Sequence, residues 1–580
     1  MHHNRSTSTD STSKRRVPLV VHSFRRVLDV SRFESPQHRR RRLEATRLNE
    51  LAPVSSLPPE LLCQIFLFHA SSFPVQGNRG LGWLTVTHVI HRWREAALSC
   101  PELSANIIFR KNLVPIMLSR SKEVPLVIRV DLDTNKHLKP RHIWQNSARL
   151  GVLDVRGSQT ALDIFFIDSV GKIAAPRLRS LSVVNTTMGD PLWLDAGVFH
   201  AADGRKSHMP RQLRMERCAL PWNSPWYSNL TDLYLAYLHK AHGPTITMLL
   251  SVIVTSPLLE HLTLIDTKTQ ADGSERVFPF ALRHLRTLHL IEPISVCAQI
   301  LMNLTFPSIV TVVICSLPSP KDTETPSSLV HSVLCHRDFC QTYDFLRIEA
   351  PTAEHVRIAT SSCSTDKTLV IDVHHGVRQL SLAPALHTLV KYSATFFSCI
   401  TTLYVSTISL KIDAWRHLCK CRYLTTLTLR SGDLLPALTL LCARAMRCLG
   451  ISKGAEAIVQ ADFDADGACN QLFPYLECIT LSGIDCGDPK SAGPSVTDVL
   501  RALLWARRAG RCPIPRVRLE ACENVFQQDL NYLRFLATDS FVWDGAGLNS
   551  KEKDDPGFPD IRSFSLNVFE RMPFCIGPTF

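Results

Sequence analysis

Glycine is scarce in this sequence, with 24 residues in 580, or about 4% against the roughly 7% that is typical. Loops that hold phosphate groups need several glycines at fixed spacing. Neither the G-x-G-x-x-G nor the G-x-x-x-x-G-K-[S/T] pattern occurs in the chain. We therefore expect no Gly-rich phosphate-binding loop and, more generally, predict no cofactor.

Long apolar runs are also missing. The N-terminal residues 1–16 contain no apolar stretch of the kind found in secretory signals. The most apolar long window, Ile246 to Ile265, is interrupted by Ser, Thr, Pro, Glu and His, so it is too broken to cross a bilayer. The sequence predicts a cytoplasmic and/or nuclear protein with no membrane partner.

The 19 cysteines form neither a disulfide framework nor a zinc pattern. Their number is odd and they are scattered along the chain, which fits reduced thiols. The closest pairs, Cys335/Cys340 and Cys419/Cys421, do not belong to a four-ligand zinc set. We interpret the cysteines as small buried apolar residues and predict no metal site.

Two short motifs resemble functional loops but are incomplete. Asp462-x-Asp464-x-Asp466-Gly467 matches half of a calcium loop, yet the required bidentate Glu is replaced by Phe473. The segment 336–338 reads His-Arg-Asp, as in a kinase catalytic loop, but Tyr343 stands where the metal-binding Asn is needed. With no recognisable catalytic set, we predict that the protein is not an enzyme.

Positive charge is concentrated near the N-terminus. Residues 1–50 hold twelve Arg/Lys and five Asp/Glu, which gives +7 of the chain's net +13. No aromatic residues alternate with the Arg39–Arg42 cluster, so base stacking is unsupported. We interpret the cluster as a solvated helix face, and we rank nucleic-acid binding through the tail as the third hypothesis for function.

Helical patterns fill residues 38–104. A helix is expected from about His38 until Pro53. In the next segment Pro58 and Pro59 open a helix whose apolar positions include Leu61 and Phe66. A further helix is predicted over 83–97, because apolar residues recur there at i, i+3, i+7, i+10 and i+14.

From residue 111 on, a Leu-x-x-Leu-x-Leu pattern keeps returning. Pattern starts at 230, 259, 285 and 309 are separated by 29, 26 and 24 residues, within the 20–29-residue period of leucine-rich repeats. Each pattern predicts a short strand with one face inward. Helices are expected between the strands, over Ile246–Thr255, Ser295–Leu304, Asp413–Cys419, Leu434–Arg444 and Val496–Arg508. The segments 315–395 and 530–580 fit the period poorly, and 317–328 is expected to be a loop.

Three motifs in a fixed order suggest a family. They are Leu57-Pro58-x-Glu60-Leu61-Leu62-x-x-Ile65-Phe66, then Val89-x-x-x-Trp93-Arg94, then Pro101-Glu102-Leu103. Together they resemble an F-box, and with the repeats they resemble the F-box/leucine-rich-repeat proteins abundant in mushroom-forming fungi. The box covers about fifty residues, and the weaker repeat resemblance covers most of the remainder.

The resemblance implies a role in ubiquitin ligation. F-box modules bind the Skp adaptor, which links them to a cullin scaffold, while the repeats would hold an unknown target protein. The positions that match the adaptor-binding surface are Leu57, Pro58, Leu61, Ile65, Phe66, Val89 and Trp93. The chain would then be the substrate-receptor subunit of an SCF-type ubiquitin ligase. The alternative is a repeat-based interaction scaffold whose box is a remnant that does not bind the adaptor.

The expected fold class is α/β, with a small all-helical F-box-like module followed by a degenerate leucine-rich-repeat solenoid. The predicted divisions are a disordered basic tail (1–37), the module (38–110), the solenoid (111–545) and a C-terminal tail (546–580).

Overall fold

The computed structural model describes residues 36–51, 53–73, 82–109, 113–135, 140–167, 174–188, 192–194, 209–270, 279–307, 311–317, 326–334, 343–352, 355–362, 365–374, 386–388, 394–407, 412–418, 420–430, 435–448, 472–487 and 494–549. The chain divides into two compact units, 1–181 with 197–208 and 182–196 with 209–580. Most of the two predicted tails and the motifs at 336–338 and 462–467 lie outside the described residues.

The first unit begins with helices. They are α1 (Pro36–Leu51), η2 (Pro53–Ser56), α2 (Pro59–Ser72), η3 (Gly82–His88), α3 (His91–Ser99) and α4 (Pro101–Ala105). Proline stands in the first turn of α2 and of α4, where its missing N–H has no intrahelical partner to lose. The buried residues Leu62, Ala97 and Leu103 join α2, α3 and α4 in one small core.

The predicted helix over 83–97 is wrong as one continuous element. The 3-10 helix η3 ends at His88, and α3 starts afresh after Ile90, whose backbone is extended. Two hydroxyls compete for backbone carbonyls in η3, since Thr85 Oγ1 donates to Gly82 O at 2.9 Å and Thr87 Oγ1 to Leu84 O at 2.7 Å. Such bonds and a run of β-branched residues disfavour an α-helix. The break leaves Val89 in an exposed turn.

Strands follow the helices in the first unit. Strand β1 (Asn106–Ile107) pairs in parallel with β2 (Leu126–Asp131), which pairs in parallel with β3 (Leu150–Gly157). The elements between and after them are α5 (Val114–Arg120), α6 (Arg141–Trp144), η4 (Ser147–Arg149) and α7 (Gln159–Ile167). Strand β4 (Ser180–Asn185) stands at the boundary of the two units.

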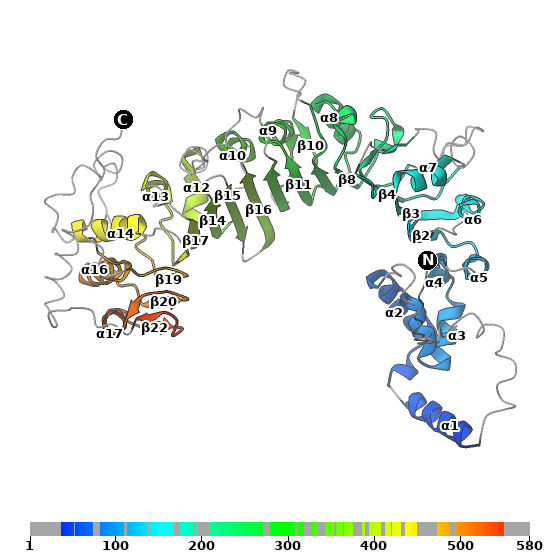
Figure 1. Ribbon diagram of the computed structural model, residues 1–580, viewed down its shortest axis with the longest axis horizontal. Coiled ribbons are helices and arrows are strands. Elements are labelled where there is room, and N and C mark those ends of the chain that lie inside the picture. Colours follow the sequence, from blue (N-terminus) through cyan, green and yellow to red (C-terminus); the bar gives the residue numbers. More distant parts are fainter. Residues whose placement is uncertain are drawn as a thin grey trace, which may run out of the picture. The chain divides into compact units, whose positions relative to one another are not determined.

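The second unit is built on a large, mostly parallel sheet (Figure 1). Its neighbouring strands are, in spatial order, β6 (Gln212–Glu216), β8 (Asp232–Ala236), β9 (His261–Ile265), β11 (Thr287–Glu292), β13 (Thr311–Ser316), β16 (Thr365–His374), β15 (His355–Ser362), β14 (Phe345–Thr352), β17 (Thr402–Thr407), β18 (Thr426–Arg430), β19 (Cys478–Ser482), β20 (Arg516–Glu520) and β22 (Ser540–Trp543). Short pairs lie beside it, formed by β5 (Leu192–Trp193) with β7 (Cys218–Ala219), β10 (Phe280–Ala281) with β12 (Leu304–Thr305), and β21 (Val525–Phe526) with β23 (Leu548–Asn549).

The recurring leucine pattern accounts for this sheet. Leu233 is in register with Leu262, which is in register with Leu288, and all three are buried. The first leucine of the pattern, as at Leu230 and Leu259, is buried just before its strand. Because side chains alternate along a strand, the residues between the leucines point to the other face of the sheet. The predicted α/β class is confirmed at this level.

The segment that fits the repeat period poorly contains an antiparallel insertion. Strand β15 runs antiparallel to both β14 and β16, while β16 is parallel to β13 and β14 is parallel to β17. These three strands form a meander that lies in the sheet in the order β16, β15, β14. Its two outer strands continue the parallel pairing with β13 and β17. It adds the partly exposed Arg347 and Arg357 to the outward face of the sheet.

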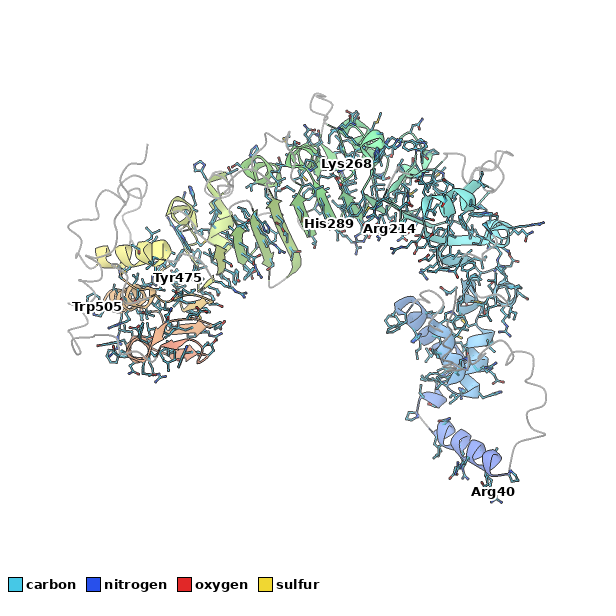
Figure 2. The ribbon with its side chains drawn as sticks, in the orientation of Figure 1. Arg40, Arg214, Lys268, His289, Tyr475 and Trp505 are labelled. Carbon is cyan, nitrogen blue, oxygen red and sulfur yellow. The ribbon has the colours of Figure 1, made fainter. Side chains whose placement is uncertain are left out.

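Helices cover one face of the sheet, with α8, α9 and α10 lying along one side of the strands in Figure 1. They are η5 (Pro225–Tyr227), η6 (Lys240–His242), α8 (Ile246–Val254), α9 (Ile294–Met302), α10 (Pro326–Leu334), α12 (Ala394–Cys399), α13 (Ile412–Leu418), α14 (Leu435–Cys448), α16 (Val496–Ala509) and α17 (Gln527–Leu536). The five predicted interstrand helices are present as α8, α9, α13, α14 and α16. Figure 2 shows Arg214 and His289 on the strand side of this layer.

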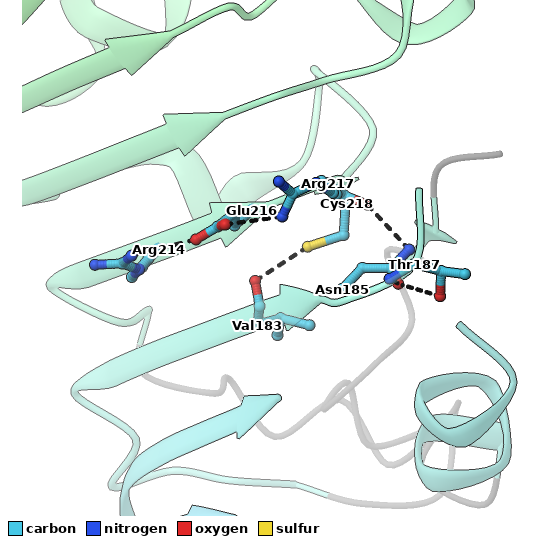
Figure 3. A network of polar contacts seen from close by, with 7 residues as sticks. All are labelled: Val183, Asn185, Thr187, Arg214, Glu216, Arg217 and Cys218. Carbon is cyan, nitrogen blue, oxygen red and sulfur yellow. Dashed lines mark hydrogen bonds and ion pairs between the residues drawn. The ribbon is translucent and has the colours of Figure 1, made fainter. Parts of the chain in front are cut away.

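A recurring turn at the carboxyl ends of the strands holds neighbouring strands together. In five turns one residue has positive φ, and the next residue is buried; the positive-φ residues are Arg217, Tyr237, Asp266, Gly483 and Ala521. Figure 3 shows how one turn is fixed, with the Cys218 thiol donating to Val183 O at 3.2 Å and Asn185 Nδ2 donating to Arg217 O at 3.4 Å. Both bonds join the turn that follows β6 to β4.

Gly547 is a position where any side chain should disrupt the second unit. It has a φ of +66°, and a Cβ atom there would lie 2.0 Å from Cys522 O. We expect Gly547→Ala to lower the free energy of unfolding by more than about 2 kcal/mol, because the clash is with backbone. Gly545→Ala is the matched control: its φ is +83° but a Cβ would meet nothing within 4 Å, so about 1 kcal/mol is expected. If urea denaturation showed the same loss of unfolding free energy for both variants, the close approach of Gly547 to Cys522 O would be contradicted.

Glu292, at the end of β11, predicts a pH dependence. Its carboxylate accepts from Thr267 N at 2.7 Å and Thr267 Oγ1 at 2.6 Å, and burial raises the pKa of the carboxyl from 4.5 to about 7. The unfolded chain then loses this proton near pH 4.5 and the folded chain only near pH 7. The contribution of Glu292 to the free energy of unfolding is therefore complete below pH 4.5. It decreases by up to about 3 kcal/mol as the pH rises to 7.

The Glu292→Gln variant isolates this effect. The unfolding midpoint of this variant, measured from pH 4.5 to 8, should increase relative to that of the wild type as the pH rises. The reason is that glutamine carries no charge to desolvate. Parallel midpoint curves for the two proteins would contradict a raised pKa at Glu292.

Candidate protein-binding surfaces

Helix α2 has two apolar faces. Leu62, Phe66 and Ala70, spaced four apart, are buried in the core of the helical module. On another face Leu61 and Ile65 are 44% and 48% exposed, and Phe68 is 75% exposed. A helix that is apolar on more than one side normally lies between two neighbours. Within the part of the first unit that the structure describes, only one of these faces is covered.

The start of α2 is fixed by backbone bonds. The N–H groups of Leu61 and Leu62 donate to Pro58 O at 3.1 and 3.2 Å. Arg92 Nη2 donates to Leu57 O at 2.6 Å, which ties the entry of α2 to the first turn of α3. Leu57 is half-buried and Pro58 is exposed, so the Leu-Pro pair borders the exposed face without being part of the core.

Two predicted positions serve the core more than the surface. Phe66 is only 1% exposed, and its ring lies 5.3 Å from that of half-buried Trp93. The thiol of Cys63 donates to Ala96 O at 3.5 Å and holds α2 against α3 in the same region. The structure thus places Phe66 inside the module, where its side chain is not accessible to a partner.

The remaining predicted positions are accessible. Leu61 and Ile65 lie on one face of α2, and Val89 is 55% exposed in the turn between η3 and α3. Phe68, which the motif did not single out, completes the α2 face, since 61, 65 and 68 follow an i, i+4, i+7 spacing. We define the α2 face as Leu61, Ile65 and Phe68, with Pro58 and Val89 as accessible neighbours on the same module.

The strand side of the second unit offers a different surface. The outward residues of adjacent strands stand in register, so each row crosses the sheet; one row runs Arg214, Tyr234, Thr263, His289, Val313. Burial lowers the pKa of His289, which keeps that imidazole neutral at pH 7. The surface mixes arginine, tyrosine, hydroxyl and aliphatic side chains, a composition suited to protein recognition.

The described residues contain no group of three or more His, Cys, Asp or Glu side chains arranged to hold a metal ion. Nor does any helix in the described parts of the chain have both the length and the apolar character needed to traverse a bilayer.

Comparison with known proteins gave no significant match, either to a protein-family model or to a curated protein. The two surfaces therefore have to be interpreted from their own geometry and chemistry.

Proposed function

We propose that this protein is a non-catalytic substrate receptor of an SCF-type ubiquitin ligase. The helical module is an F-box that binds the Skp adaptor, and the adaptor connects the chain to the cullin scaffold. The observation that carries this proposal is the second, uncovered apolar face of α2. A binding module needs such a face, whereas a module that only begins a larger fold does not.

The order of the motifs supports the same role. Leu57-Pro58 opens α2, Leu61 and Ile65 are exposed on it, and Val89 is exposed in the turn before α3. These accessible residues are five of the seven positions that match the adaptor-binding surface. Phe66 and Trp93 would contribute indirectly, by holding α2 and α3 in place.

The second unit would hold the target protein. We interpret it as a leucine-rich-repeat solenoid, in which each strand–helix repeat buries its leucines against the neighbouring repeats. The in-register leucines, the recurring positive-φ turn and the helical layer support this interpretation. Repeat proteins of this kind present long open surfaces and no enclosed reaction chamber, in agreement with a receptor that performs no chemistry itself.

The proposal is tested by a pulldown with purified components. The immobilised full chain should retain the Skp adaptor, and the Leu57→Ala/Pro58→Ala variant should retain much less. A folded wild-type chain that retains no adaptor would refute the receptor role and favour an interaction scaffold with a non-binding box.

A further inference from the structure

The strand face of the second unit carries two separated clusters of arginine and tyrosine. In the first cluster Arg214 lies over the ring of Tyr234, with Cζ 4.0 Å from the centroid, and Arg217 lies over Tyr237 at 4.9 Å. Both guanidinium groups contact Glu216, at 3.3 and 2.9 Å. The Arg214 side chain is 48% exposed and that of Glu216 only 17%. The guanidinium group is therefore accessible to a partner, whereas the carboxylate is mostly buried.

The second cluster has the same construction on β14 to β18. Arg347 Nε donates to Glu349 at 2.8 Å and its Cζ lies 4.5 Å from the centroid of Tyr404. Arg430 Nη1 donates to the Tyr404 hydroxyl at 3.5 Å, and Arg357 lies 3.9 Å from Glu349. The Arg347 and Arg357 side chains are 43% and 44% exposed against 18% for Glu349, so guanidinium groups again form the outer surface.

The second cluster also includes Asp372 on β16, which is 16% exposed and lies 4.0 Å from Arg357. Between the two clusters, β9, β11 and β13 present no formal charge in the same two rows. Their outward residues are half-buried Thr263, Ile265, His289, Ile291, Val313 and Cys315. Burial keeps two of them neutral near pH 7, by lowering the pKa of His289 and raising that of Cys315. The result is a neutral, partly apolar strip with a cationic cluster at each end.

The dimensions of the strip restrict its occupant. From Arg214 on β6 to Arg357 on β15 the register runs through six strand-to-strand steps, which at about 4.8 Å each give about 29 Å. An extended chain covers that distance in about nine residues. The strip occupies two of the three outward side-chain rows of β9, β11 and β13 and is about 7 Å wide, which is close to the width of one extended chain.

We propose that this face binds an extended segment of a partner protein, with a carboxylate side chain at each end and mainly apolar side chains between them. The acidic residues would lie about nine positions apart, one on each arginine cluster. The inference rests on the proposed function only in that the partner would be the target of the ligase. Nucleic acid fits less well, because its evenly spaced phosphates would have to cross an uncharged strip of the face.

A peptide selection tests the proposal. Random twelve-residue peptides displayed on phage, selected on the immobilised full chain, should be enriched in pairs of Asp or Glu about nine positions apart. The enrichment should disappear on the Arg214→Gln/Arg357→Gln variant and persist on Arg534→Gln, which removes one exposed arginine on helix α17. Selection without acidic pairs, or equal enrichment on the double variant, would overturn the inference.

Binding of a selected peptide, measured by fluorescence anisotropy, should weaken about tenfold with Arg214→Gln or with Arg357→Gln, and about as much when one terminal acid becomes an amide. A peptide that binds only when serine phosphate replaces its acids would also overturn the carboxylate assignment. The Skp adaptor is absent from this experiment. A negative result therefore counts against the target surface alone, and a failed adaptor pulldown counts against the proposed function alone.

Discussion

Replacing Leu61 and Ile65 by aspartate is expected to weaken binding of the Skp adaptor by more than about 100-fold. Both side chains are about half exposed on α2, and a bound partner would bury them. Two buried apolar contacts would be lost and two carboxylates would be forced into an apolar interface, each change costing about 2 kcal/mol or more. Isothermal titration of the full chain with purified adaptor measures the effect.

Stability separates a binding defect from a folding defect in this experiment. Because the two positions lie at the surface, the thermal midpoint of Leu61→Asp/Ile65→Asp should stay close to that of the wild type. Phe66→Ala, which truncates a buried side chain of the same helix, should instead lower the free energy of unfolding by about 3–5 kcal/mol.

The matched control for the α2 face is Ile164→Asp/Ile167→Asp. These two isoleucines are exposed on α7 in the same unit, and they receive the same change in charge and polarity. The control variant should bind the adaptor as the wild type does. If both double variants lose binding equally, or neither does, the α2 face is not the adaptor site.

A large loss of stability is also expected from Asp529→Ala. Asp529 is completely buried on α17, where Arg501 Nη1 of α16 donates to it at 3.0 Å and Thr497 Oγ1 donates at 2.9 Å. Arg501 also lies over the ring of Tyr532, with Cζ 3.8 Å from the centroid. Without Asp529 the buried guanidinium loses its main counter-charge, which typically costs about 3–5 kcal/mol.

Hydrogen exchange reports this loss locally. The amides of α16 and α17 should exchange roughly 100- to 5,000-fold faster in Asp529→Ala, while those of β8 and β9 should change little. The double variant Arg501→Met/Asp529→Leu should recover much of the protection, because no charge is then left buried. Uniformly faster exchange in both regions, or no recovery in the double variant, would contradict a local role for this ion pair.

Much of the sheet could be predicted from the sequence because the leucine spacing reports both the strands and their inward face. The N-termini of five interstrand helices follow from the same pattern, since each must start soon after a strand. Helix α16 adds a capping box, in which Ser495 and Asp498 bond reciprocally to each other's backbone N–H. Such local signals need no knowledge of distant residues.

Other features could not be predicted, because they depend on side-chain hydrogen bonds, turn conformations and long-range strand pairing that a periodic pattern does not report. Threonine hydroxyls and β-branched side chains interrupt the helical stripe at 83–97. The positive-φ turns carry Arg217, Tyr237, Asp266 and Ala521 instead of glycine, so no glycine signal marks them. The meander β14–β16 places its strands in reversed order, which depends on pairing between residues far apart in the chain.

The candidate surfaces were predicted to different degrees. The box motif identified Leu61, Ile65 and Val89, and helical spacing from Leu61 could have added Phe68. The arginine clusters could not be predicted, because Arg347 and Arg430 meet at Tyr404 only through the register of β14, β17 and β18. The separation of the two clusters also depends on the inserted meander.

Reconstitution of a three-component complex tests the receptor role most directly. The full chain, the Skp adaptor and the cullin scaffold, each purified, are mixed and separated by size-exclusion chromatography with light scattering. The account predicts one complex with one copy of each component, which does not form when the adaptor is omitted or when the chain carries Leu61→Asp/Ile65→Asp. A folded wild-type chain that elutes apart from the adaptor–cullin pair would contradict it.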